Sequence, residues 1–220
     1  MPLAGKGMLL TSMDLDPADE AGFNRWYDRE HLQERVAIDG FIEARRYVAH
    51  RAHPKYLCLY STETFDVLES PAYLAALANP TDWSTATMAR FKNMIRAVAR
   101  ITISRGQGRG AALGIVRLRH GNDRVRAALK DRLDPAALDG IISMHLIEGD
   151  PVLSRPIGAD PSSSNTGTGD WFVLIDGTEV DAVAELAARF SGRSAFEPAS
   201  VVSSGVYRLM WDLAKQDMVG

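Results

Sequence analysis

The pattern of apolar and polar positions divides the first half of the chain into strand-like and helix-like segments. Strands are predicted over residues 7–15, 39–50, 55–63 and 99–105, where apolar residues alternate or run together between turn residues. Helices are predicted from Asp16-Pro17 to about Val36, and over residues 65–78 and 83–96. With the last two helical segments counted together, the order of elements is βαββαβ.

The second half repeats this order. Its predicted strands cover residues 111–119, 139–149, 170–177 and 203–213, and its helices cover 123–133 and 180–190. The sequence DGFI at 39–42 aligns with DGII at 139–142, and LYSTETFDV at 59–67 aligns with LIDGTEVDA at 174–182. The second alignment has the larger offset, and the extra residues fall in Ser154–Gly169, a segment rich in Ser, Gly and Pro that we expect to be a mobile surface loop. We therefore predict two repeats, over residues 1–106 and 107–220.

Two such repeats predict an α+β fold. Each βαββαβ unit is a ferredoxin-like unit, with one antiparallel sheet and both helices on the same face. The bare sheet faces are expected to pack against each other, so that two tandem ferredoxin-like repeats form an intramolecular α+β barrel with a central cavity. A homodimer of whole chains is compatible with this arrangement.

A motif in the first predicted helix stands out from an ordinary amphipathic pattern. The segment FNRWYDREHLQERV, residues 23–36, begins with large aromatics and then places Glu30 and His31 where the apolar stripe should continue. This motif, followed by GFIEARRY, resembles the helix-and-strand region of EthD-like proteins of the dimeric α+β barrel superfamily. That family usually has Trp and His four residues apart, whereas Trp26 and His31 are five apart and Tyr27 has the spacing of four.

Alternation along the strands predicts which side chains face the barrel cavity. In the second strand Phe41, Glu43, Arg45 and Tyr47 are expected to point inward, with Arg46 on the helix side, where it must reach solvent or a carboxylate. For the third and seventh strands the expected inward-facing residues are Tyr56, Cys58, Tyr60, Trp171, Val173 and Ile175. The offset of the repeat places His145 at the position of Arg45, across the barrel.

These positions give a candidate site. His31, close to the cavity mouth, is the candidate for proton transfer, since an imidazole titrates near neutral pH. Arg45 and His145 are expected to bind or polarise a ligand oxygen, and Tyr47 and Tyr60 to orient the ligand. The other candidate binding residues are Trp26, Tyr27, Glu43, Trp83 and Trp171. Two structural alternatives stay open: Glu43 and Arg45 form an ion pair between the sheets, and DREHLQER is a solvated helix face.

Composition narrows the function classes. The 25 Lys+Arg and 28 Asp+Glu give a net charge of −3, so we expect no nucleic-acid partner. Cys58 is the single cysteine, which excludes an internal disulfide and fits a reducing compartment. The sequence contains neither a signal-peptide core nor an apolar run of membrane-spanning length, so we expect a cytoplasmic protein with no membrane partner. No metal or cofactor motif is recognisable, so we expect neither.

The leading hypothesis is a cofactor-independent enzyme of the lyase, isomerase or cyclase type. It would act by proton transfer on a small apolar, aromatic substrate in the barrel cavity, chemistry that the superfamily resemblance implies. The alternatives are a non-catalytic protein that binds a small ligand, and a cofactor-free oxygenase. A haem protein with His145 as the axial ligand is a more distant alternative.

Overall fold

Eight strands close into one antiparallel barrel in the part of the chain that this computed structural model describes, residues 3–155, 169–192 and 199–218. Their order around the barrel is β1-β3-β2-β8-β5-β7-β6-β4, and β4 pairs with β1 to complete the ring. The strands are β1 Gly7–Asp14, β2 Phe41–Arg51, β3 Tyr56–Thr62, β4 Lys92–Gly106, β5 Ala112–Arg119, β6 Ile141–Gly149, β7 Trp171–Gly177 and β8 Ser200–Ala214. A closed sheet has no free edge, so every strand has two neighbours.

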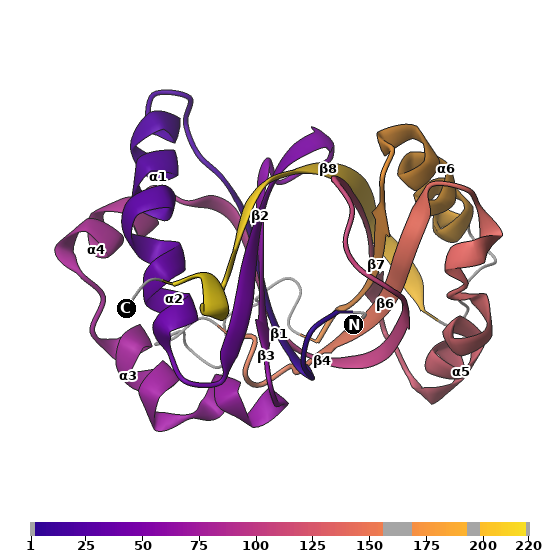
Figure 1. The fold of residues 1–220 in the computed structure, drawn as a ribbon, viewed down its shortest axis with the longest axis horizontal. Helices are drawn as coiled ribbons and strands as arrows, with labels where there is room; N and C mark the ends of the chain where they lie inside the picture. The colour runs from indigo at the N-terminus through magenta and orange to yellow at the C-terminus, as the bar shows by residue number, and fades with distance from the viewer. Residues whose placement is uncertain (1–2, 156–168, 193–198, 219–220) are drawn as a thin grey trace.

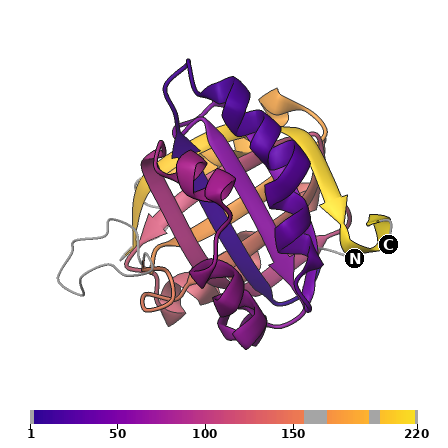
Figure 2. The same cartoon turned by 90° about the vertical axis from the view of Figure 1, so that its left-hand side faces the viewer.

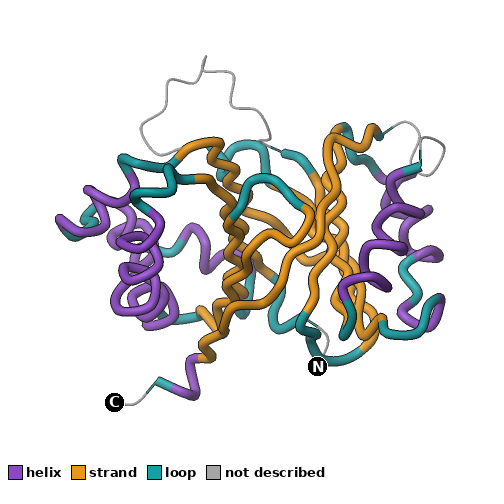
Figure 3. Tube along the Cα trace, turned by 90° about the horizontal axis from the view of Figure 1, so that it is seen from above, coloured by secondary structure: helices purple, strands orange, loops and turns teal. Residues whose placement is uncertain are grey.

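Two layers of helices cover opposite sides of the barrel (Figures 1 and 3). The first layer consists of α1 Glu20–Trp26, the π-helical turn η1 Tyr27–His31, α2 Leu32–Ala37, α3 Pro71–Ala78 and α4 Asp82–Met88. The second layer consists of α5 Asp123–Arg132 and α6 Val180–Ser191. Short 3-10 segments lie at η2 Phe65–Glu69, η3 Pro135–Ala137 and η4 Lys215–Asp217. Figure 2 shows the first layer lying across the strands of the first half.

The longest strands tie the two halves together. β4 pairs with β1 of its own half and with β6 of the other half, and β8 pairs with β5 and with β2. The barrel is therefore built by both halves jointly. Its closed antiparallel form agrees with the predicted α+β class.

The predicted strands and helices are found in the predicted order, with corrections to three of their positions. The helix predicted from Asp16-Pro17 begins at Glu20, and the helix predicted over 65–78 consists of η2 followed by α3. The predicted helix over 83–96 ends at Met88, and β4 begins at Lys92. Residues 92–98 extend because they pair with β1, and this pairing buries Ala97 and Val98. Most of the predicted loop Ser154–Gly169 lies outside the described residues.

Side chains fill the centre of the barrel. This interior core includes Met8, Leu10, Leu57, Leu59, Leu113, Phe172 and Leu174. The predicted central cavity is therefore occupied by apolar side chains over this part of the barrel. Burying them supplies much of the stability of the fold, at roughly 1.5–3 kcal/mol for each fully buried large side chain.

The structure reverses the predicted faces of β3 and β7. Tyr56, Cys58 and Tyr60 pack against the first helix layer, while the alternate residues Leu57 and Leu59 face the interior. In β7, likewise, the predicted inward residues Trp171, Val173 and Ile175 pack against the second helix layer. Every residue of both strands is buried, so apolar side chains occupy both faces and alternation carries no information about direction.

The face of Phe41 is also corrected. A register shift between Phe41 and Glu43 turns the Phe41 ring to the helix side, where it lies 5.5 Å from the Tyr73 ring. From Glu43 onward, β2 follows the predicted alternation, with Glu43, Arg45 and Tyr47 inside the barrel.

Candidate functional site

A cavity of about 420 Å³ lies between the first helix layer and strands β1, β3 and β4. We call it the helix–sheet cavity. Its apolar wall includes Leu9, Met13, Leu77, Met88, Phe91 and Met94. Four predicted site residues, Trp26, Tyr27, His31 and Tyr60, also line it. A mostly apolar hollow of this size with a few polar groups is typical of a small-molecule site.

The π-helical turn accounts for the unusual spacing of Trp26 and His31. A π-helix closes i→i+5 hydrogen bonds, and the Leu32 amide donates to the Tyr27 carbonyl. The extra residue in this turn brings positions five apart onto the same face. The Trp26 and His31 rings consequently stack, with centroids 4.1 Å apart and planes at 25°. Tyr27 contacts the same imidazole edge-on at 5.2 Å.

Glu30 holds the Trp26 indole rather than facing the cavity. The indole Nε1 donates to Glu30 Oε1 at 3.2 Å and to Ser84 Oγ at 3.1 Å. The same carboxylate oxygen accepts hydrogen bonds from Thr81 Oγ1 at 2.7 Å and Ser84 Oγ at 3.3 Å. This network ties η1 to α4 and fixes the ring on which His31 stacks.

His31 is neutral in this environment. Burial lowers the pKa of its imidazole well below the usual value, and the guanidinium groups of Arg35 and Arg46 lower the pKa further. Its Nδ1 lies 3.9 Å from Glu34 Oε2, too far for a hydrogen bond. A neutral imidazole with no bonded partner on Nδ1 fits the role of a proton acceptor.

Several buried polar atoms of cavity-lining residues lack a hydrogen-bond partner in the described structure. They belong to Thr11 (Oγ1), His31 (Nδ1) and Arg35 (Nε and Nη1). The Tyr60 hydroxyl also lines the cavity, and it lies beside Tyr27 and Cys58, with which it shares side-chain hydrogen bonds. Burial raises the pKa of the Tyr60 hydroxyl well above its usual value, so this group is a proton donor at neutral pH. Leaving the groups of Thr11, His31 and Arg35 unpaired costs roughly 1–3 kcal/mol each, and a polar ligand would remove part of that cost.

The other predicted charged residues form a separate cluster inside one end of the barrel. Arg45 bonds Glu43 at 2.9 Å and lies 3.7 Å from Asp176, and its Nη1 is 3.5 Å from the Tyr47 hydroxyl. His145 lies 3.7 Å from the other oxygen of Asp176. The structure thus brings Arg45 and His145 together, but apart from His31, which belongs to the helix–sheet cavity. The Glu43–Arg45 ion pair left open by the sequence is present, but both of its members lie in β2, so the pair itself does not join two sheets.

His145 is not placed as an axial haem ligand. Both of its ring nitrogens are hydrogen-bonded, Nδ1 to Ser104 Oγ at 2.7 Å and Nε2 to Ser143 Oγ at 3.1 Å. The residue is also fully buried among the interior side chains. An axial histidine needs one free ring nitrogen and space for the macrocycle beside it, so this residue does not fit that role.

Trp83 and Trp171 lie away from both groups. Trp83 is 37% exposed and borders a small surface hollow with Arg25 and Thr87. Trp171 packs in the second helix layer, where Arg126 lies 5.3 Å above its ring. The structure therefore supports neither as a neighbour of His31.

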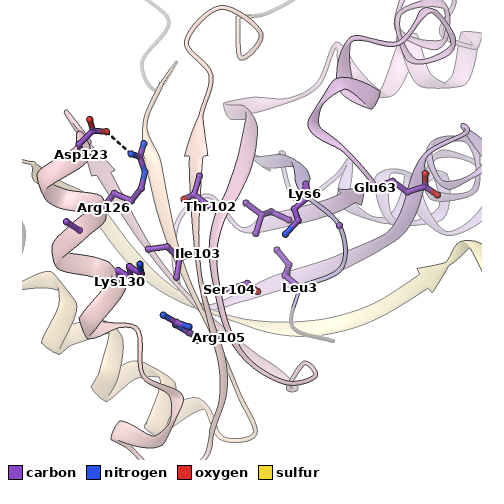
Figure 4. A pocket seen from close by; sticks show the side chains of 13 residues that line it. Leu3, Lys6, Glu63, Thr102, Ile103, Ser104, Arg105, Asp123, Arg126 and Lys130 are labelled. Carbon is purple, nitrogen blue, oxygen red and sulfur yellow. Dashed lines mark hydrogen bonds and ion pairs between the residues drawn. The ribbon is translucent and has the colours of Figure 1, made fainter.

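A second, larger hollow of about 770 Å³ lies over β4, between the N-terminal segment and α5 (Figure 4). Its floor includes Ile101 and Ile103, and Lys6, Arg105 and Lys130 stand around it as exposed cations. Arg126 is already paired with Asp123 and with Glu148. Exposed or paired charges make this hollow a weaker candidate than the helix–sheet cavity.

Sequence reasoning missed Arg35 and Thr11. Arg35 lies four residues after His31 on the same helical face, so helix periodicity from His31 could have identified it. Thr11 is in β1, and its contribution follows only from the position of that strand beneath η1. Within the described ranges, no group of three or more His, Cys, Asp or Glu side chains is arranged to hold a metal ion.

No helix of the described residues has both the length and the apolar character needed to cross a membrane. Neither a protein-family model nor a curated protein matches the sequence. The similarities found are to solved structures.

Similar solved structures cover the chain almost end to end. An anthrone oxidase-like protein is 9% identical with a TM-score of 0.64, and the match covers 100% of this chain and 98% of that one. A monooxygenase-like protein of Fusobacterium nucleatum is 7% identical with a TM-score of 0.56, covering 96% and 95%. A chlorite dismutase-like protein is 13% identical with a TM-score of 0.54, covering 94% and 96%. These neighbours belong to the dimeric α+β barrel superfamily, and at such low identity the similarity shows that this chain shares their fold.

Proposed function

We propose that the protein is a cofactor-independent enzyme that transfers a proton on a small aromatic compound bound in the helix–sheet cavity. The observation that carries this proposal is the group of unpartnered buried polar atoms of residues that line an otherwise apolar cavity. Packing alone does not account for such atoms, because each of them is costly to bury. A ligand with an apolar body and a polar edge would satisfy both parts of the wall.

In the proposed reaction, His31 is the general base. The neutral imidazole takes a proton from an acidic carbon or hydroxyl of the substrate, and the electron pair left behind moves onto a conjugated oxygen. The protonated Tyr60 hydroxyl lines the same cavity, and turning from its neighbours Tyr27 and Cys58 would let it donate a hydrogen bond to that oxyanion. Return of the proton to another atom gives an isomer, and expulsion of a group gives a lyase or cyclase reaction.

Trp26 and Tyr27 position the base. The stacked Trp26 and the edge-on Tyr27 restrict the imidazole plane. The hydrogen bonds from Trp26 to Glu30 and Ser84 in turn restrict the indole. A base held in one orientation contributes more to catalysis than a mobile one, because the cost of orienting it has been met during folding.

We also propose a finer family assignment, EthD-like, on the basis of the sequence motif at residues 23–47, and a tandem duplication with units over residues 1–106 and 107–220. Both halves have the same element order, and Gly40 and Gly140, which correspond in the repeat, both adopt positive φ, +83° and +87°. Positive φ favours glycine, so its presence at both equivalent turns supports a common origin. A homodimer of whole chains stays a prediction.

Two other functions use the same cavity. A cofactor-free oxygenase would take the substrate carbanion onward with molecular oxygen, and the names of the anthrone oxidase-like and monooxygenase-like neighbours favour this alternative. A non-catalytic binding protein would hold the compound without proton transfer. We keep proton transfer as the proposal, because it is the step that the neutral His31 supports directly.

Anthrone is a suitable probe, since it is an apolar aromatic ketone with an acidic methylene group. In anaerobic D₂O, the wild-type protein should accelerate deuterium exchange at that methylene, followed by mass spectrometry. His31→Ala should lower the protein-dependent rate by about two or more orders of magnitude, the usual scale for general acid–base catalysis. The matched control is His50→Ala, at an exposed histidine outside the cavity, which should exchange like the wild type.

Three outcomes separate the alternatives. If exchange depends on His31 and the protein consumes no oxygen when anthrone is added in air, proton transfer is the complete reaction. Exchange accompanied by stoichiometric oxygen uptake favours the oxygenase. Quenching of tryptophan fluorescence by anthrone without any exchange indicates a binding protein. Separately, unchanged exchange in a folded His31→Ala variant contradicts the role of His31.

A further inference from the structure

Arg35 is a buried cation that forms no salt bridge with a carboxylate of the described residues, and the adjacent Glu34 attracts it only over a longer distance. Its relative exposure is 7%, and it lines the helix–sheet cavity. Nη2 reaches the Ala76 carbonyl at 3.5 Å, a long hydrogen bond, while Nε and Nη1 are buried without any partner among the described residues. A guanidinium has five N–H donors, so most of its hydrogen-bonding capacity is unused.

The other buried arginines of the described chain are all paired with acids. Arg45 bonds Glu43 at 2.9 Å, Arg46 bonds Asp28 at 3.0 Å, and Arg117 bonds Asp170 at 2.7 Å. The fold thus supplies a carboxylate wherever an arginine is buried for structural reasons. Arg35 differs from them in two respects: it lacks that carboxylate, and it lies on a cavity wall.

We propose that the carboxylate partner of Arg35 comes from the substrate, so that the helix–sheet cavity selects aromatic carboxylates. This inference rests on the proposed function for the location of the site. An unpaired buried cation is costly, and an anionic ligand removes that cost at the moment of binding. Charge-assisted hydrogen bonds from a guanidinium to a carboxylate are also about twice as strong as neutral ones.

The spacing of Arg35 and His31 sets the shape of the ligand. The two residues are four apart along one face of η1 and α2, so their Cβ atoms are about 5–6 Å apart. The reacting atom of the ligand should therefore lie about one helical turn from its carboxylate. The positive charge of Arg35 lowers the pKa of His31. A ligand carboxylate bound to Arg35 would offset that charge and so stabilise the imidazolium that His31 forms when it accepts a proton.

The experiment compares 2-naphthoate with 2-naphthamide, two probes of almost identical shape that differ in charge. Binding to the full chain is measured by titration calorimetry. The wild-type protein should bind naphthoate at least about tenfold more tightly than the amide, the range expected for a hydrogen bond to a charged group. Arg35→Gln should remove that preference. Arg29→Gln, a matched change at an exposed position of the same helical segment, should retain it.

Thermal unfolding gives a second readout that a structural role would move in the opposite direction. Because Arg35→Gln removes an unpaired buried charge, the Tm of the free protein should be unchanged or higher, and naphthoate should raise the Tm only when Arg35 is present. A strongly lowered Tm in the free variant, equal affinity for both probes, or no detectable naphthoate binding at about millimolar concentration would overturn the inference.

These results are independent of catalysis. A His31→Ala variant should still prefer naphthoate, because the preference is an equilibrium property of Arg35. If the charge preference is found but His31-dependent exchange is not, the proposed enzyme function fails while the ligand class stands. The reverse pair of results rejects the ligand class and leaves the proton-transfer function in place.

Discussion

The two helix layers cover opposite sides of the barrel in different ways. In the second layer, α5 and α6 close over β5 to β8 with aliphatic side chains, among them Val125, Leu129, Val183, Leu186 and Ala187. In the first layer, aromatic and polar side chains surround a cavity of about 420 Å³. The second layer is a close-packed apolar core of the kind that stabilises a fold. The first departs from that arrangement along η1 and α2.

The difference can be traced to the helical sequences. In α6, the buried residues Val183, Leu186, Ala187 and Phe190 follow the regular 3.6-residue period. In the first layer, the stripe that begins with Phe23 and Trp26 passes through His31 and Arg35. Polar groups therefore stand at positions where the second layer has aliphatic ones. This substitution of polar for apolar positions is the strongest local sign of a function.

The largest expected effect concerns Arg46, a buried cation of β2 that packs beneath the first helix layer. Arg46 is fully buried, bonds Asp28 and Asn24, and lies 4.2 Å above the Tyr27 ring. Arg46→Ala should lower the free energy of unfolding by about 3–5 kcal/mol, because it leaves a void beneath η1 and removes the hydrogen bonds to Asp28 and Asn24. Urea denaturation followed by circular dichroism measures this change.

The matched change in the second layer is Arg189→Ala. Arg189 pairs with Glu185 one turn away on the surface of α6, and both side chains are more than half exposed. Such a pair contributes at most about 0.5 kcal/mol. Similar losses for both variants would show that Arg46 is not the centre of the first layer.

A smaller effect tests whether the first layer is hollow. Leu129 is fully buried on α5, and Leu129→Ala should cost about 2–5 kcal/mol through the cavity that it creates. Leu77 is partly buried and already borders the helix–sheet cavity, so Leu77→Ala should cost about 1 kcal/mol or less. Equal costs, measured by the same urea titration, would mean that the first layer is packed as tightly as the second.

Much of the barrel was predictable from the sequence because element order depends on local patterns. The direction of β3 and β7 was not, because neither strand has an exposed face that would break the symmetry of the alternation. The start of β4 was also missed. The segment KNMIRAV has no strong strand pattern, and its extended conformation depends on pairing with β1, a contact made far along the chain.

The candidate site was predictable in its residue types but not in its place. His31 was identified because an imidazole interrupts an aromatic stripe. Its stacking on Trp26 requires a π-helical turn, for which the sequence gives no independent signal. The reversed face of β3 then moved Tyr60 from the barrel interior to the wall beside His31. Because the π-helical turn and the face of β3 were not predicted, the sequence placed the site at the centre of the barrel, whereas the structure places these residues beneath the first helix layer.

The smallest effect is a dependence of stability on pH that only the first layer should show. Folding lowers the pKa of His31 below its usual value of about 6.5, so the unfolded chain takes up a proton at this residue before the folded protein does. Above about pH 6.5 the His31 imidazole is neutral in both the folded and the unfolded state. In that range His31 therefore adds no pH dependence to the free energy of unfolding. As the pH falls from there toward the lowered pKa, the unfolded state gains protonation free energy, and the free energy of unfolding decreases by up to about 1.4 kcal/mol per pH unit.

His31→Gln removes this titration while the other histidines titrate as before. The difference in the free energy of unfolding between wild type and variant should therefore be constant above about pH 6.5 and shift against the wild type below it. Neither α5 nor α6 contains a histidine, so the second layer contributes no such titration from its helices. Urea titrations at half-unit pH steps from about 7.5 to 5 measure the difference. A difference independent of pH would mean that His31 is protonated equally in both states, and the neutral base assigned to the helix–sheet cavity would then be wrong.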